Sequence, residues 1–144
     1  MSATDESEVR ATLGEFFVAM ATWEEASKAR YRLAKKEALP HENAKELSMN
    51  ELREVFREYC TTWERPSRAR FGAPYVSMKP TYGTELETIR TVHVENDNAT
   101  VVTQQSTGAR NSLVYRLVRV DGKWRIHDNR KRVDSSGQEV DWDL

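Results

Sequence analysis

The stretch that decides the fold is residues 86–133, which read LETIRTVHVENDNATVVTQQSTGARNSLVYRLVRVDGKWRIHDNRKRV. β-branched and aromatic residues recur here with a period of two, which is typical of strands with one buried face. The pattern predicts four strands: Leu86–Glu95, Ala99–Thr107, Asn111–Val120 and Lys123–Val133. The links between them are short and rich in turn residues, with Asp121-Gly122 as a strong hairpin pair. Because such short links join antiparallel neighbours, the stretch predicts an antiparallel meander.

The preceding part of the chain, residues 5–65, is rich in the helix-forming residues Ala, Glu, Lys and Arg. A first helix is predicted to continue to about Ala38, where Pro40 stops it, because its apolar residues keep helical spacing. These residues are Val9, Leu13, Phe16, Phe17, Met20 and Trp23. The charged residues that follow, Glu24 and Lys28 among them, are predicted to lie on the solvated side of this helix.

A second helix is predicted to begin near Ser48. Ser48-Met49-Asn50-Glu51 matches a capping box, and Leu47 with Leu52 matches a hydrophobic staple. Its expected apolar face is Leu52, Val55, Phe56, Tyr59 and Trp63, and Pro66 closes it. Residues 41–47 are expected to add only a short extra turn, and residues 75–78 a further short strand. The predicted fold class is α+β, with N-terminal helices packed on one face of a curved antiparallel sheet.

Length and composition indicate a single domain over residues 1–144, with helices over about 5–65, a sheet over about 75–133 and a short acidic C-terminal tail. Lys and Arg number 22 and Asp and Glu number 23, and this near balance argues against a nucleic-acid binder. The first residues are acidic and lack the apolar segment of a signal peptide. No apolar run is long enough to span a membrane, so the expected location is the cytoplasm and no membrane partner is expected.

The sequence carries no motif for catalysis, a cofactor or a metal. It lacks a phosphate loop, a dinucleotide fingerprint, a nucleophile elbow and an HExxH pattern. The single cysteine, Cys60, excludes an internal disulfide and is interpreted as a partly buried helix residue. His41, His93 and His127 do not have the spacing of metal ligands. We therefore predict no catalytic residues, no cofactor and no metal.

A basic cluster lies on the last predicted strand, where Arg130, Lys131 and Arg132 follow each other. Because acidic residues from Asp134 to Asp143 come directly after it, the simplest interpretation is a solvated strand. The functional interpretation is a contact with another protein. The predicted partner-binding residues are Arg125, His127, Arg130, Lys131 and Arg132.

Several runs in the second half resemble the immunity proteins that have a nuclear-transport-factor-two-like fold. The runs are Pro80-Thr81-Tyr82-Gly83-Thr84, residues 101–108 (VVTQQSTG), residues 115–118 (YRLV) and residues 121–126 (DGKWRI). The resemblance covers about residues 75–143. It implies a cone-shaped fold and a cytosolic protein that binds and neutralises a cognate bacterial polymorphic toxin without chemistry of its own. After Ile126 the chain differs from the family's expected acidic and aromatic segment, which suits a surface that varies with its partner.

Two other functions stay open on the sequence alone. The first is a small-molecule isomerase, dehydratase or cyclase of the same fold, with a pocket acid or base drawn from Tyr115, His93, Asp128 or His127. The second is a non-enzymatic scaffold or oligomerisation domain that uses the open sheet face, including a homodimer through that face. The fold does not choose between these functions.

Overall fold

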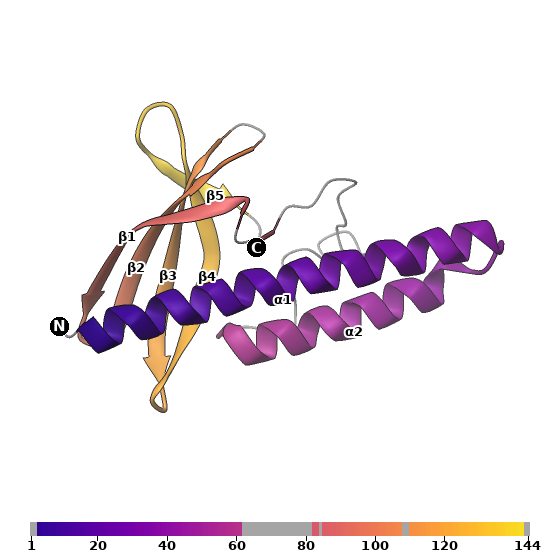
Figure 1. The fold of residues 1–144 in the computed structure, drawn as a ribbon, viewed down its shortest axis with the longest axis horizontal. Coiled ribbons are helices and arrows are strands. Elements are labelled where there is room, and N and C mark those ends of the chain that lie inside the picture. The colour runs from indigo at the N-terminus through magenta and orange to yellow at the C-terminus, as the bar shows by residue number, and fades with distance from the viewer. Residues whose placement is uncertain (1–2, 62–81, 84, 108–109, 143–144) are drawn as a thin grey trace.

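The computed structural model describes residues 3–61, 82–83, 85–107 and 110–142, and Figure 1 shows its two helices followed by a sheet. The helices are α1 (Ala3–Lys36) and α2 (His41–Tyr59). The strands are β1 (Glu87–Glu95), β2 (Asn98–Gln105), β3 (Ser112–Val120), β4 (Lys123–Val133) and β5 (Glu139–Trp142). The α+β class and the four predicted strands are confirmed, with strand ends that differ by two residues or fewer. The strand expected over residues 75–78 lies outside the described residues.

The strands form one antiparallel sheet in the order β1-β2-β3-β4-β5. Irregularities interrupt the register between Ile89 and Thr91 on β1 and between Val114 and Arg116 on β3. The second is a bulge in β4, because Tyr115 on β3 is opposed by residues 128–130. Bulges increase local twist and bend a sheet, in agreement with the curved strands in Figure 1.

The C-terminal residues that were predicted to form an acidic tail include a strand. The carboxylate of Asp134 accepts hydrogen bonds from the backbone N–H groups of Ser136 and Gln138, at 2.9 Å each. These bonds turn the chain back, and Gly137 adopts a φ of 85° in the turn. β5 then pairs with residues Arg130–Val133 of β4.

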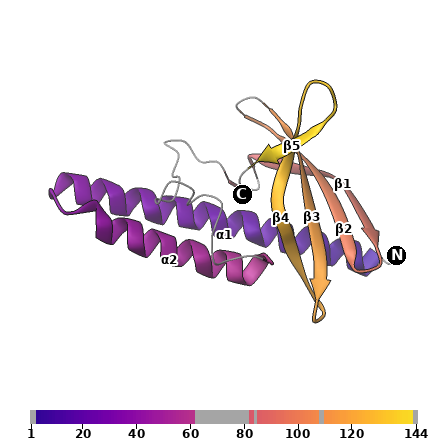
Figure 2. The same cartoon turned by 180° about the vertical axis from the view of Figure 1, so that it is seen from behind.

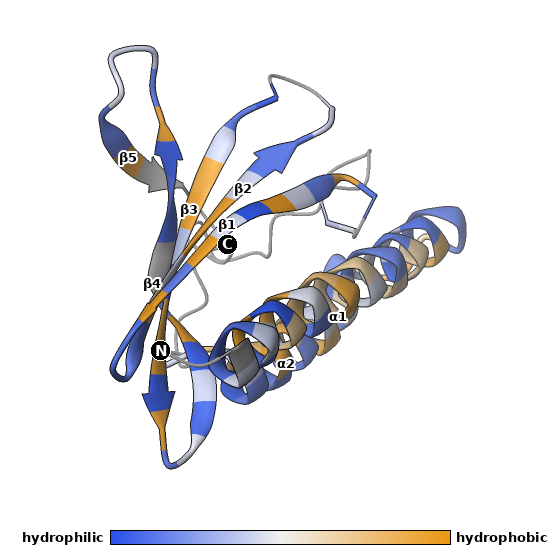
Figure 3. Cartoon of the chain, turned by 60° about the vertical axis from the view of Figure 1, so that its left-hand side comes forward, coloured by the Kyte–Doolittle hydropathy of each residue, from blue (hydrophilic) through white to orange (hydrophobic). Residues whose placement is uncertain are grey.

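Both helices pack against one face of the sheet, here called the inner face (Figure 3). Every member of the predicted α1 stripe is buried there, as are Leu52 and Phe56 of α2. The sheet contributes alternate residues, such as Val101 and Thr103 of β2. Tyr115 and Leu117 of β3 belong to the same core as Trp124 and Ile126 of β4. The reason is that β3 and β4 are neighbours whose alternate residues face the helices together.

The predicted start of the second helix is wrong, because α2 begins at His41 and Ser48 lies inside it. Ser48 is buried against α1: its carbonyl accepts the indole N–H of Trp23 at 2.7 Å, and its hydroxyl accepts from Arg30 at 3.0 Å. Leu47 is 55% exposed and therefore forms no buried staple. The predicted apolar residue Trp63 and the predicted stop at Pro66 lie outside the described residues.

Candidate partner-binding surface

The side of the sheet that faces away from the helices is here called the outer face. Figure 2 views the molecule from this side, with the sheet in front and α1 passing behind it. Since both described helices pack on the inner face, the outer face carries the side chains of the sheet that remain open to contact. These include Thr88 and His93 of β1, Thr100 and Val102 of β2, Arg116 and Val118 of β3, and His127 and Lys131 of β4.

A polar row crosses the outer face at the middle of the sheet. His93 pairs with Thr100, Thr100 with Arg116, and Arg116 with His127. Arg116 forms a bidentate ion pair with Glu139 of β5, with N–O distances of 2.9 and 3.2 Å. The hydrogen bonds from Arg116 lower the pKa of Glu139, and the same pairing raises the pKa of Arg116. Both side chains remain largely exposed. The row therefore offers charge and hydrogen-bonding groups to a partner.

His127 and Lys131 are predicted site residues that lie on this outer face, and Arg125 shares their side of β4 because it pairs with Val118. His127 is exposed, and its Nδ1 shares a hydrogen bond with the hydroxyl of Thr61 at 3.1 Å. Lys131 is partly buried and lies across from Val114 on β3 and Asp141 on β5. The register thus places three of the predicted residues on one side of β4.

Arg125 lies on the same side of β4, but its side chain already makes hydrogen bonds within the protein. Its Nη1 donates to the backbone carbonyls of Arg57 at 2.5 Å, Glu58 at 3.4 Å and Cys60 at 3.4 Å. These carbonyls lie at the C-terminal end of α2, where the helix dipole favours a cation. Arg125 therefore fastens α2 to the sheet, and any contact with a partner would have to share this role.

Arg130 is 4% exposed and points to the inner face, so it is not part of the outer surface. Its Nη1 donates to the hydroxyl of Tyr115 at 2.9 Å and lies 3.7 Å from Oε1 of Glu87. Its guanidinium carbon is 5.0 Å from the centre of the Tyr82 ring. Desolvation opposes the charge of Arg130. Its interactions with Tyr115, Tyr82 and Glu87 outweigh desolvation and raise its pKa, so the side chain stays charged. Arg132 also lies on the inner side, across from Leu113.

A buried polar cluster around Arg130 was missed by the sequence analysis. Glu87 accepts a short hydrogen bond of 2.5 Å from the hydroxyl of Thr103. Glu24 of α1 accepts the backbone N–H of Tyr82 at 3.0 Å. Glu24 and Lys28 are both buried, which corrects the prediction that they face solvent. They follow the buried Met20 and Trp23 at helical spacing, and extending that stripe by one turn would have found them.

The enzyme alternative requires two of its four candidate residues to meet in one cavity. Tyr115 is fully buried on the inner face, and burial raises its pKa well above the usual value, so the phenol stays protonated. His93 and His127 are exposed on the outer face, three strand spacings or about 14 Å apart. The side chain of the fourth candidate, at position 128, is not among those described. The three described candidates do not converge.

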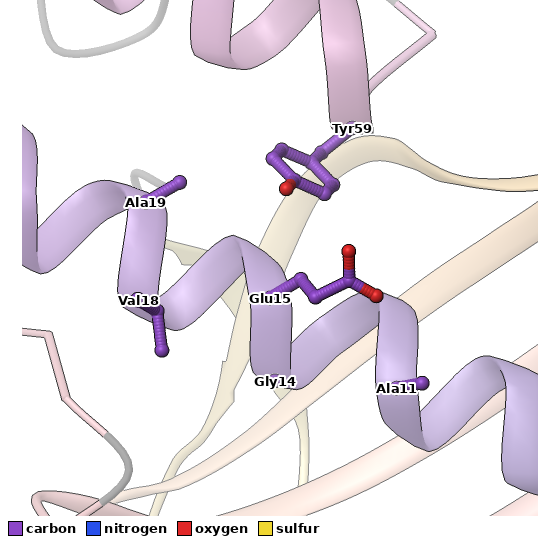
Figure 4. A pocket seen from close by; sticks show the side chains of 6 residues that line it. All are labelled: Ala11, Gly14, Glu15, Val18, Ala19 and Tyr59. Atoms are coloured by element: carbon purple, nitrogen blue, oxygen red, sulfur yellow. The ribbon is translucent and has the colours of Figure 1, made fainter.

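A shallow groove lies between α1 and the C-terminal end of α2, as Figure 4 shows. Its lining is mostly apolar and comprises Ala11, Gly14, Glu15, Val18, Ala19 and Tyr59. Partial burial, and then the carboxylates of Glu15 and Glu58, raise the pKa of Tyr59, so its hydroxyl stays protonated. Its ionisable groups are the Glu15 carboxylate and the Tyr59 hydroxyl, and neither belongs to the residues considered for the enzyme alternative.

The described residues also show no group of three His, Cys, Asp or Glu side chains that could hold a metal ion. Cys60 is buried, and burial raises its pKa to about 12, with Arg125 acting weakly in the opposite direction. A thiol with this pKa is a poor nucleophile and a poor metal ligand. Neither described helix is both long and apolar enough to cross a membrane.

Comparison with known protein families gives a match over residues 8–142 to NTF2 fold immunity proteins. The chain belongs to this family. No curated protein and no solved structure matched it. Membership confirms the resemblance inferred from the second half and extends it over both helices. The family description indicates that this chain is an immunity protein.

Proposed function

We propose that this protein neutralises a cognate toxin by binding it directly, without chemistry of its own. Membership in the immunity family over residues 8–142 is the observation that carries the proposal. The partner is then a protein, and neutralisation works by covering the toxin's active surface or by placing complementary charge against it. We expect binding to occur in the cytoplasm, which cell fractionation tests.

We further propose that the outer face of the sheet contacts the toxin. The support is that both described helices pack on the other side, which leaves this face to a partner. His127 and Lys131 lie on it beside Arg116, and Arg116 is already tied to Glu139. A partner with a carboxylate opposite Lys131 would complement this arrangement. Arg125 would contribute by holding α2 to β4.

Co-expression tests the function. The toxin domain encoded beside the gene for this protein is expressed in cells with and without it, and survival is counted. We expect survival only when both proteins are present, together with a complex that elutes as one species. Unchanged killing in the presence of folded protein would refute the proposal.

Charge reversal tests the surface. Lys131→Glu is expected to weaken toxin binding about tenfold, because one rim charge pair changes affinity by about 1 kcal/mol or more when reversed. Arg32→Glu on α1 is the matched control, because it reverses an exposed cation on the helical layer. Equal affinity of both variants, measured by titration calorimetry, would place the contact elsewhere.

Self-association through the same face remains the alternative that the sequence analysis raised. Light scattering on the purified protein tests it, and a monomer at all concentrations rules it out. If a dimer forms and the toxin dissociates it, the two partners share the outer face.

A further inference from the structure

Strand β1 forms one edge of the sheet, and this edge offers main-chain hydrogen-bonding groups. β1 is first in the strand order, and within the described residues only β2 pairs with it. In an antiparallel pair, about half of the N–H and C=O groups of an edge strand point away from its neighbour. The strand has nine residues and no proline, so no residue lacks a donor.

The regular part of this edge is Thr91–Glu95. These five residues pair with β2 without interruption, from Thr91 opposite Val102 to Glu95 opposite Asn98. The irregularity between Ile89 and Thr91 ends the regular stretch on the other side. Five residues span about 17 Å, which matches a short strand of a partner.

The apolar core is incompletely covered at this edge. Val92 points to the inner face and is only partly buried, whereas Val101, its neighbour on β2, is completely buried. Ile89 is also partly buried and packs against the core. An added strand that places apolar side chains on the inner face would complete the burial of Val92.

The two ends of the stretch carry opposite charges, so a partner strand with charges of its own would pair better in one orientation than in the other. Arg90 lies next to the irregularity and is exposed, and Glu95 is 78% exposed at the other end. Opposite charges across neighbouring strands stabilise their pairing, and like charges oppose it. A matching strand therefore carries an acidic residue near Arg90 and a basic residue near Glu95.

We infer that the edge of β1 over Thr91–Glu95 binds an extended segment of the toxin as an additional strand. The segment alternates apolar and polar residues, with its charges ordered opposite to Arg90 and Glu95. This inference rests on the proposed function and adds the manner of binding. Main-chain hydrogen bonds supply affinity, and the charges and the partly buried Val92 supply specificity.

Hydrogen exchange on the full-length protein tests the inference. The protein is measured alone and in complex with an inactive form of the toxin domain encoded beside its gene. We expect the outward-facing amides among residues 91–95 to exchange at least about tenfold more slowly in the complex, because an added strand bonds these N–H groups. A stable complex with unchanged exchange at these residues would overturn the inference but leave the proposed function intact. If no complex forms, the proposed function fails, and this inference fails with it.

A pair of variants separates strand addition from simple covering of the edge. Val92→Lys places a charge on the inner side of the edge, where a long side chain can still reach water from a partly buried site. Leu33→Lys is the matched control at an exposed position of α1. We expect Val92→Lys to weaken toxin binding at least about tenfold and Leu33→Lys to leave it unchanged, with circular dichroism showing both variants folded. Equal affinity of the two folded variants would overturn the inference.

Discussion

The side chain of Arg130 brings a positive charge into the core, where Tyr115 and Glu87 depend on it. Removing one member of a buried ionic pair leaves the other without compensation, at a cost of about 3–5 kcal/mol. We expect Arg130→Met to lower the free energy of unfolding by that amount, since methionine fills space but cannot pair with Glu87. Urea denaturation followed by tryptophan fluorescence measures the difference.

The neighbouring residue provides the control for this prediction. Lys131→Met removes a cation from the outer side of the same strand and should cost less than about 1 kcal/mol. Adding Glu87→Gln to Arg130→Met should recover part of the lost free energy of unfolding, because a neutral amide then replaces the unpaired carboxylate. Equal midpoints for Arg130→Met and Lys131→Met would contradict the role given to Arg130.

The position of Arg130 could have been predicted from strand parity. On β4, Trp124, Ile126 and Arg130 are separated by even numbers of residues, so a regular strand places them on one face. Charge alone groups Arg130 with Lys131 and Arg132, whereas the alternation of a strand places Lys131 on the opposite face. The partners Glu87 and Tyr115 were not predictable, because they meet Arg130 only through the pairing of four strands.

The hairpin of β4 and β5 depends on carboxylates that are charged at neutral pH. Hydrogen bonds from the Ser136 hydroxyl and from backbone N–H groups lower the pKa of Asp134, and hydrogen bonds from Arg116 lower the pKa of Glu139. A lowered pKa in the folded state stabilises the fold above the pKa of the unfolded chain, about 4, and this contribution disappears as the pH falls further.

We therefore expect the hairpin to loosen in acid before the rest of the sheet. Between pH 6 and pH 3, the amides of β5 should lose protection from exchange earlier than those of β2 and β3. The Glu139→Gln variant should show a weaker pH response, by at most about 1 kcal/mol, because its ion pair with Arg116 is largely exposed. Simultaneous loss of protection in all strands would argue against a local effect.

The turn after α1 contains a residue that is poorly suited to its conformation. Ala38 has a φ of 51°, and the N–H of Leu39 donates to the carbonyl of Ala34 at 2.8 Å, which closes the helix end. Glycine adopts this conformation without the steric cost of a Cβ atom. We expect Ala38→Gly to raise the free energy of unfolding by about 1 kcal/mol. Ala29→Gly, exposed within α1, should lower it by a similar amount, and thermal denaturation compares the two.

Strands were predicted better than helix ends for a physical reason. In each of the first four strands the apolar residues recur with a period of two, and turn residues mark where the strand ends. Both local signals indicate a strand at the same place. The Ser48-to-Glu51 pattern also occurs inside a helix, because Ser48 is held there by Trp23 and Arg30 of α1. β5 has four residues, too few for a periodic signal, and it forms because the Asp134 turn brings it back to β4.

The helical layer and the sheet are joined at two separate places. At the N-terminal end of α1, Arg119 of β3 binds Asp5 at 2.8 Å and stacks on Trp124. At the C-terminal end of α2, the backbone of Cys60 forms an isolated β-bridge with Ile126 of β4. The side chain of Arg125 adds a hydrogen bond to the carbonyl of Cys60. Together with the shared apolar core, these two junctions hold β3 and β4 against the helices.

Cys60 allows the second junction to be followed in solution. Its pKa of about 12 leaves roughly 10³-fold less thiolate at pH 8 than an unperturbed thiol has, and the side chain is buried as well. A thiol reagent at pH 8 should therefore label the folded protein only through opening of the α2–β4 junction. We expect the rate of labelling to rise with urea along the same curve as the loss of tryptophan fluorescence, because both layers share one core. If Cys60 reacts well below the urea midpoint, α2 separates from β4 before the sheet unfolds, and the outer face would then be held by the strands alone.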